Sequence, residues 1–315
     1  MPLLCWKCWP RSVRTTTPAL FSPATTIRRQ SLSINSRAPK GKAMAVFRKP
    51  GDRVGPYKIS KRLGAGGNGI AYRATDAKDE FVVLKLLTDS NLAQANFEIE
   101  LSMSVLAACA SAYRGLEEHF VPVLALLRDN DDFFLVMPYM IGGSIADALA
   151  KRGKLDYEVV RMAIRPPMLA CHVMHKVGVV HRDVKPANLL LRDHPARSAL
   201  ADFGISAPAN TPLRAPGYST GYSCPEQMFN HPASPAQDVF SFAATIYELA
   251  TGIRPFAAAT EDEEDQLVGD YTVTHTPLNT LAPNIPHSVA RAVDAALSKN
   301  PLARPSLREL YQSFN

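Results

Sequence analysis

The spacing of apolar residues divides the chain into a strand-rich first part and a helix-rich second part. In the first part, four short segments read as strands: Tyr57–Leu63, Ala71–Thr75, Phe81–Leu87, which is an apolar run with one cation in it, and Phe133–Met137. A longer stretch without Gly or Pro, from Asn91 to about Cys109, predicts a helix. Beyond Gly142 the spacing is mainly helical. Strands followed by helices predict an α+β protein of two lobes.

Composition is that of a globular protein large enough for two hydrophobic cores. The chain has 315 residues, of which 46% are apolar and 20% charged. The longest apolar candidate for a membrane span, residues 121–140, is interrupted by Arg128, Asp129, Asp131 and Asp132. We therefore expect no membrane span.

Charge is concentrated at the N-terminus. Ten of the 35 Lys and Arg residues lie in residues 1–51, which contain no acid, so the other 25 face 29 acidic residues. The body of the protein is therefore mildly acidic, which argues against a nucleic-acid-binding surface. Residues 1–50 read as a disordered basic tail, and the same composition fits a mitochondrial or plastid transit peptide. Translation from Met44 is an alternative, and a cytoplasmic, intracellular location is the default.

The five cysteines do not form a disulfide framework. Cys5 and Cys8 make one C-x-x-C pair, but no second pair follows to complete a zinc site. The remaining three, Cys109, Cys171 and Cys224, have apolar or loop surroundings and read as free thiols of a reducing compartment.

A glycine-rich turn and a lysine suggest a phosphate site in the first part. Gly64, Gly66 and Gly69 join two predicted strands, whereas the similar dinucleotide-binding glycines join a strand to a helix. Glycines let the backbone approach phosphates without Cβ clashes. Lys85 follows sixteen residues after Gly69, inside the third apolar strand.

Two polar motifs in the second part have the spacing that phosphoryl transfer needs. His181-Arg182-Asp183-Val184-Lys185-Pro186-Ala187-Asn188 places an acid, a cation and an amide on one short loop. Asp202-Phe203-Gly204 follows fourteen residues after Asn188. An aspartate can orient an attacking hydroxyl, a lysine can meet the γ-phosphate, and Asn plus Asp can hold magnesium.

These motifs resemble those of the eukaryotic-type Ser/Thr protein kinase family. The resemblance covers about residues 55–315 and implies a two-lobed kinase fold. It places a small antiparallel β-sheet lobe with one main helix at 55–140 and a mostly helical lobe at 141–315. It implies ATP and Mg²⁺ as cofactors and a protein substrate with a Ser or Thr acceptor.

The resemblance assigns the catalytic and metal-binding roles. Asp183 is the expected catalytic base, Lys185 its Ser/Thr-type companion, and Asn188 and Asp202 the metal ligands. Lys85 is expected to bind the α- and β-phosphates and to pair with a helix glutamate. Both Glu98 and Glu100 are candidates, and the spacing from Lys85 favours Glu100.

The remaining nucleotide contacts follow from the same comparison. Met137 is expected to gate the pocket, the Met140 amide to bind adenine, and Leu190 to form the floor beneath the base. Pro138, where many kinases have Glu, keeps the carbonyl that adenine needs. The other residues expected to contact the nucleotide are Leu63, Gly64, Ala65, Gly66, Gly69, Ala71 and Val83.

Further positions imply structural and regulatory roles. Ser219 is expected to bridge Asp183 and Lys185, and Asp238 to anchor the catalytic loop. Glu226 is expected to pair with Arg304 in a buried site, where loss of either would cost several kcal/mol. Thr211 is the candidate phosphorylation site, and Arg214 or an intrinsically ordered loop is the alternative. 

Pro166 and Pro167 fall inside the helix that precedes the catalytic loop. Because proline lacks the N–H that a helix interior needs, we expect the helix to restart there, with the prolines in its first turn, and therefore to be kinked or shortened.

The sequence therefore predicts an active Ser/Thr protein kinase that is monomeric by default. We expect the last helix of the large lobe to end just before Asn315 and no sensor domain to follow it. A pseudokinase that only binds nucleotide and a small-molecule kinase are the alternatives. The presence of Lys85, Asp183, Asn188 and Asp202 disfavours the first, and the Cys224-Pro225-Glu226 segment disfavours the second.

Overall fold

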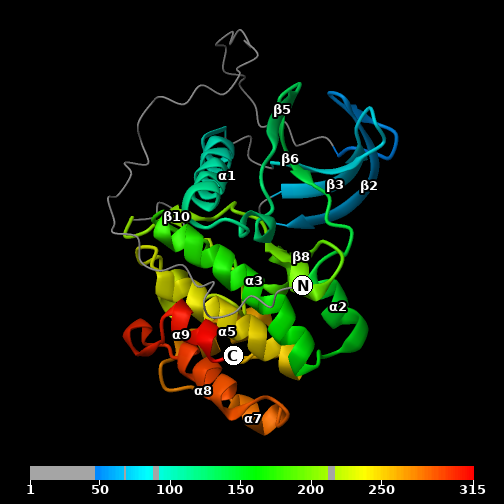
Figure 1. Ribbon diagram of the computed structural model, residues 1–315. Coiled ribbons are helices and arrows are strands. Elements are labelled where there is room, and N and C mark those ends of the chain that lie inside the picture. The colour runs from blue at the N-terminus through cyan, green and yellow to red at the C-terminus, as the bar shows by residue number, and fades with distance from the viewer. Residues whose placement is uncertain (1–46, 67–68, 88–91, 212–216) are drawn as a thin grey trace.

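The computed structural model describes residues 47–66, 69–87, 92–211 and 217–315. The chain forms an upper lobe built on one sheet and a lower lobe built on helices, with the polypeptide crossing between them after β6 (Figure 1). The two-lobed α+β fold expected from the apolar pattern is confirmed.

The upper lobe contains an antiparallel sheet in the order β1-β2-β3-β4-β6-β5. Its strands are β1 (Arg53–Val54), β2 (Tyr57–Gly66), β3 (Gly69–Thr75), β4 (Phe81–Leu86), β5 (Ala125–Asp129) and β6 (Asp132–Pro138). Helix α1 (Leu92–Ala112) belongs to the same lobe. The four predicted strands are present, and the glycines join β2 to β3 as expected.

Alternation in β4 explains how a cation comes to lie inside this lobe. Leu84 and Leu86 are fully buried and pack with Tyr72 and Phe134 in the core of the sheet. Successive side chains of a strand point to opposite faces, so Lys85 must leave β4 on the other side. That side faces α1 and the lower lobe (Figure 1).

A short segment before β1 is tied to the far side of the sheet. The Arg48 guanidinium lies 2.7 Å from the Asp129 carboxylate and 3.1 Å from that of Asp132, at the turn between β5 and β6. It also lies over the Phe134 ring, and the backbone N–H of Arg48 donates to the Tyr72 hydroxyl. Arg48 therefore attaches the segment before β1 to the turn between β5 and β6.

The lower lobe packs around α3 and α5, which cross its centre (Figure 1). Its helices are α2 (Ile145–Arg152), α3 (Tyr157–Lys176), α4 (Pro225–Met228), α5 (Pro235–Thr251), α6 (Glu261–Gly269), α7 (Leu278–Leu281), α8 (His287–Ala296) and α9 (Leu307–Gln312). Its short strands are β7 (Val179–Val180), β8 (Leu189–Leu191), β9 (Ser198–Leu200) and β10 (Ala207–Pro208). The 3₁₀ turns are η2 (Glu117–His119), between the lobes, and η3 (Pro186–Asn188), η4 (Pro195–Arg197) and η5 (Pro301–Ala303) in the lower lobe.

Helix α3 runs through both prolines, so the expected restart at Pro166 is wrong. Pro167 cannot donate to the carbonyl of Ala163, four residues earlier, and that carbonyl would be left buried without a partner. The Ser198 hydroxyl in β9 donates to it instead, at 2.7 Å. A side chain from another element thus replaces the helical hydrogen bond that proline removes.

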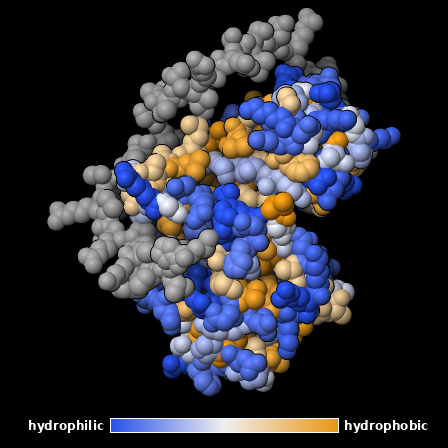
Figure 2. Space-filling model, turned by 45° about the vertical axis from the view of Figure 1, so that its right-hand side comes forward, coloured by the Kyte–Doolittle hydropathy of each residue, from blue (hydrophilic) through white to orange (hydrophobic). Residues whose placement is uncertain are grey.

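No helix in the described part of the chain is long and apolar enough to cross a membrane. Figure 2 shows polar and apolar residues mixed on the surface of the molecule, which is narrower where the two lobes meet.

Candidate active site

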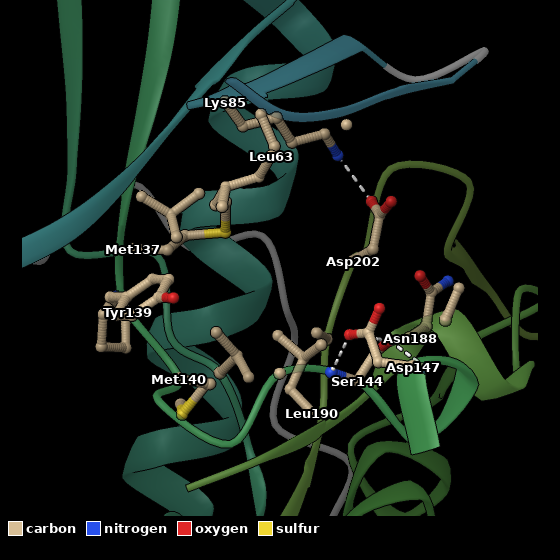
Figure 3. A pocket seen from close by; sticks show the side chains of 18 of the residues that line it. Leu63, Lys85, Met137, Tyr139, Met140, Ser144, Asp147, Asn188, Leu190 and Asp202 are labelled. Atoms are coloured by element: carbon tan, nitrogen blue, oxygen red, sulfur yellow. Dashed lines mark hydrogen bonds and ion pairs between the residues drawn. The ribbon is translucent and has the colours of Figure 1, made fainter. Parts of the chain in front are cut away.

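A cavity of about 660 Å³ lies between the two lobes, a size typical of small-molecule sites. All the predicted nucleotide contacts except Gly66, which ends β2, lie along it. In Figure 3, Leu63 and Met137 approach it from the upper lobe, and Leu190 approaches from the opposite side. The polar residues gather at one end of the cavity, near Asp202.

At that end, Asp183 is at the centre of a hydrogen-bonded network. The Lys185 ammonium donates to both Asp183 carboxylate oxygens, each at 2.9 Å. The Ser219 hydroxyl donates to Asp183 Oδ1 at 2.6 Å and accepts from Lys185 Nζ at 2.7 Å. The expected Ser219 bridge is therefore present, and a hydroxyl group fits between the carboxylate and the ammonium.

Asn188 is fixed in the same loop. Its amide nitrogen donates to the backbone carbonyl of Asp183 at 2.8 Å and to the Asp183 carboxylate at 2.9 Å. Because the nitrogen is used within the loop, the amide oxygen is the atom that can bind a cation. 

The loop keeps this shape because Asp238 holds it from below. The buried Asp238 carboxylate accepts the backbone N–H of His181 at 2.9 Å and that of Arg182 at 2.7 Å. Arg182 has a φ of 70°, a strained value for a non-glycine residue. Burial alone would raise the pKa of Asp238, but its hydrogen bond and charge interaction with His175, helped by His181 and the Arg182 amide, lower it. The anchoring expected for Asp238 is confirmed.

Lys85 crosses the cavity to Asp202. Its ammonium lies 2.5 Å from Asp202 Oδ1, an interaction drawn in Figure 3. Burial would lower the pKa of Lys85, but Asp202 and Glu98 outweigh it and raise the pKa. Burial would likewise raise the pKa of Asp202, but Lys85 outweighs it and lowers the pKa. Both groups are therefore held in their charged forms, as phosphate and cation binding requires.

Glu98, and not Glu100, is the helix glutamate beside Lys85, so the sequence-based choice of Glu100 is wrong. Glu98 is buried and its carboxylate lies 3.9 Å from the Lys85 ammonium, whereas Glu100 is exposed. An α-helix turns by about 100° per residue, so two positions two residues apart face nearly opposite directions. Only one of the two can face β4.

Several cavity residues were missed by the sequence analysis. Ser144 and Asp147 line the cavity and form a capping box at the start of α2, in which Asp147 accepts from the Ser144 backbone and hydroxyl. Both side chains lie beside the space expected to hold the nucleotide. Other lining residues that were not predicted are Lys61, Val121, Tyr139, Gly143, Ala187 and Ala201.

Gly69 is required by a close backbone contact. It has a φ of 133°, and a Cβ there would lie 2.2 Å from the Leu86 carbonyl oxygen. Any other residue would push β3 away from β4 at the edge of the cavity. The turn between β2 and β3 therefore depends on this glycine.

The segment after Asp202 is attached to the lower lobe by the pair that the sequence predicted. Arg304 and Glu226 form a two-pronged ion pair, with Nη1–Oε1 at 2.5 Å and Nη2–Oε2 at 2.9 Å. The Arg182 guanidinium donates to the carbonyls of Ile205 and Gly217 within this segment. Thr211 stays a predicted phosphorylation site, and Arg214 lies outside the described residues.

The donor set fits a divalent cation. Asn188 and Asp202 both line the polar end of the cavity and offer the amide and carboxylate oxygens that hard cations prefer. 

Comparison with known proteins agrees with this arrangement. Residues 57–314 match the family described as Protein kinase domain. The chain is 32% identical over 205 residues to the serine/threonine-protein kinase PknL of Mycobacterium tuberculosis, covering 64% of this chain and 50% of PknL. It is 30% identical over 261 residues to PknD of the same species, covering 81% of this chain and 38% of PknD.

A probable serine/threonine-protein kinase of Thermomonospora curvata, PkwA, is 29% identical over 267 residues, covering 83% of this chain and 34% of PkwA. The chain thus spans half or less of the length of these relatives. Since the family match covers more than four fifths of the sequence and includes every residue of the cavity, the chain belongs to the protein kinase family.

Proposed function

We propose that the protein transfers the γ-phosphate of ATP to Ser or Thr hydroxyls of a protein substrate, with Mg²⁺ as the metal. One observation carries the proposal: the Ser219 hydroxyl already lies between Asp183 and Lys185, at 2.6 and 2.7 Å. A substrate hydroxyl of the same size fits the same geometry. The names of the relatives support a Ser/Thr acceptor.

In the proposed reaction, the acceptor hydroxyl hydrogen-bonds to the Asp183 carboxylate, which orients its oxygen toward the γ-phosphorus. The oxygen–phosphorus bond forms as the bond to the leaving ADP oxygen breaks, and the hydroxyl proton passes to Asp183. Lys185 compensates negative charge on the transferring group, and Lys85 holds the α- and β-phosphates. Mg²⁺, held by Asn188 and Asp202, would neutralise phosphate charge.

The rest of the cavity suits the nucleotide. Met137, Met140 and Leu190 supply an apolar slot for adenine, with the Met140 N–H and the Pro138 carbonyl as polar partners. We assign Ser144 and Asp147, which line the same cavity, as the polar partners of the ribose hydroxyls. We infer that these roles belong to a kinase domain at residues 55–315, preceded by the basic tail of residues 1–50.

The test is phosphate transfer from radiolabelled ATP to a generic basic protein by wild type and Asp183→Asn. We expect transfer to Ser and Thr by wild type, and a loss of about 10²–10⁴-fold in the variant because it lacks the base. ATP affinity should be retained, since Asp183 contacts the acceptor. Normal ATP binding without transfer by wild type would instead indicate a pseudokinase.

Phosphorylation of a small alcohol but of no polypeptide would instead indicate a small-molecule kinase.

Thr211 is tested by peptide mapping of the protein after incubation with Mg-ATP. A phosphate on Thr211 in wild type but not in Asp183→Asn is the expected result. A phosphate-free Thr211 in a fully active enzyme would contradict its regulatory role.

A further inference from the structure

Under the catalytic loop, three side chains bring metal-ligating atoms together where α3 meets α5. Cys171 Sγ lies 3.3 Å from Asp238 Oδ2 and 3.3 Å from His175 Nε2. His175 Nε2 lies 2.8 Å from the same Asp238 oxygen. Cys171 and His175 are four residues apart, so both leave α3 on one face. In the described part of the chain, this is the trio of such atoms that comes within reach of one ion.

The separations are close to those around a tetrahedral ion. Zn²⁺ binds sulfur, nitrogen and oxygen at about 2.0–2.3 Å, which puts neighbouring ligand atoms about 3.3–3.6 Å apart. The two separations from Cys171 Sγ already have this length. The distance from His175 to Asp238 needs to open by only about 0.5 Å, a side-chain adjustment.

The charges also match a divalent ion. Binding requires the Cys171 thiol to release one proton to solvent, while His175 binds as a neutral imidazole with its proton on Nδ1. One thiolate and one carboxylate then balance the two positive charges of Zn²⁺. Thiolate and imidazole ligands select this ion over Mg²⁺ or Ca²⁺, which prefer oxygen.

An ion here would leave the catalytic loop anchored. Asp238 holds the loop through the N–H groups of His181 and Arg182, and the ion would replace only the side-chain donors of Cys171 and His175. Cys171 and Asp238 are fully buried, whereas the His175 side chain is 10% exposed. We therefore expect an ion, and the water that would be its fourth ligand, to enter on the His175 side.

We propose that Cys171, His175 and Asp238 form a Zn²⁺ site that joins α3 to α5 beneath the catalytic loop. This proposal is independent of the proposed kinase reaction, since none of the three side chains lines the nucleotide cavity.

The experiment is equilibrium dialysis of the full chain against Zn²⁺, with Cys5 and Cys8 replaced by Ser so that the N-terminal pair cannot bind. We expect one tightly bound ion, and Cys171→Ala should weaken binding by more than about 100-fold, because loss of a group that merely supports a ligand already costs 10–100-fold. The matched control is Cys109→Ala, which removes another buried thiol, in α1, and should leave binding unchanged.

Cobalt gives a second readout, which is spectroscopic and does not depend on measuring an affinity. Co²⁺ bound at this site should show a thiolate charge-transfer band, which Cys109→Ala keeps and Cys171→Ala loses. Binding of no ion, equal affinity in Cys171→Ala, or bound Co²⁺ without the thiolate band would overturn the proposal.

Discussion

The Lys85 ammonium is shared unequally between two carboxylates. Asp202, from the lower lobe, lies at 2.5 Å, and Glu98, from α1, lies at 3.9 Å. Lys85 therefore connects β4 both to the helix of its own lobe and to the opposite side of the cavity. In the proposed reaction, where phosphates enter the cavity and Asp202 would bind a cation, Glu98 is the partner that keeps Lys85 in place.

The roles of Glu98 and Glu100 can be separated by a matched pair of variants. Glu98→Gln should lower the rate of phosphate transfer by about 10–100-fold, because a small displacement of a positioning group has effects of this size. Glu100→Gln should leave the rate unchanged, since Glu100 is exposed. The measurement is steady-state transfer from ATP at saturating substrate. A larger loss in Glu100→Gln would show that α1 turns in the active state.

At the residue scale, the sequence predicted which residues of a local motif lie together. It did not predict which face of α1 points toward β4. Asp183, Lys185 and Asn188 lie on one short loop, so their spacing in sequence fixes their proximity in space. The choice between Glu98 and Glu100 depends on how α1 is rotated against β4. That rotation is set by packing along the whole helix, which a count of residues from Lys85 does not contain.

Among the elements, α3 shows how a helix tolerates two interior prolines. Both prolines are buried. The Ala163 carbonyl, to which Pro167 cannot donate, accepts a hydrogen bond from the Ser198 hydroxyl instead. Sequence rules correctly indicated that proline removes a helical hydrogen bond, but the helix restart that they predicted is wrong. They could not identify the compensation, because Ser198 is 35 residues away from Ala163 in sequence.

A double-mutant cycle tests this compensation. Ser198→Ala should reduce the free energy of unfolding by about 1–3 kcal/mol, because it leaves the Ala163 carbonyl buried without a donor. In a Pro167→Ala background the cost should fall below about 1 kcal/mol, since Ala at 167 restores a helical N–H to that carbonyl. Denaturant unfolding of the four proteins gives the coupling. Strictly additive effects would rule out the compensation.

For the whole molecule, η2 is a link between the lobes. It follows α1, packs against α3 and β9, and leads to a bridge between Phe120 and Leu200. His119 in this turn is only 2% exposed. Burial lowers the pKa of His119 and outweighs the opposing effect of nearby Glu118.

This lowered pKa predicts a pH dependence of stability. Below about pH 6.5 the unfolded chain takes up a proton at His119 and the folded chain does not. The free energy of unfolding should therefore fall as the pH drops from about 6.5 toward the lower pKa that His119 has in the folded protein. The contribution of His119 to this decline is up to about 1.4 kcal/mol per pH unit. His119→Leu should make the decline shallower between about pH 7.5 and about pH 5.5 in denaturant titrations. Equal slopes for the two proteins would exclude His119 as a contributor.

The contact of Arg48 with the β5–β6 turn has a practical consequence for where the protein can be trimmed. The family match begins at Tyr57, but a fragment cut there loses the Arg48 charge that pairs with both Asp129 and Asp132. We expect such a fragment to be less stable than one that starts at residue 47. Arg48→Met in the longer fragment should account for about 1–3 kcal/mol of the difference. We therefore expect the shortest stably folded fragment to begin before Tyr57, where the family match begins.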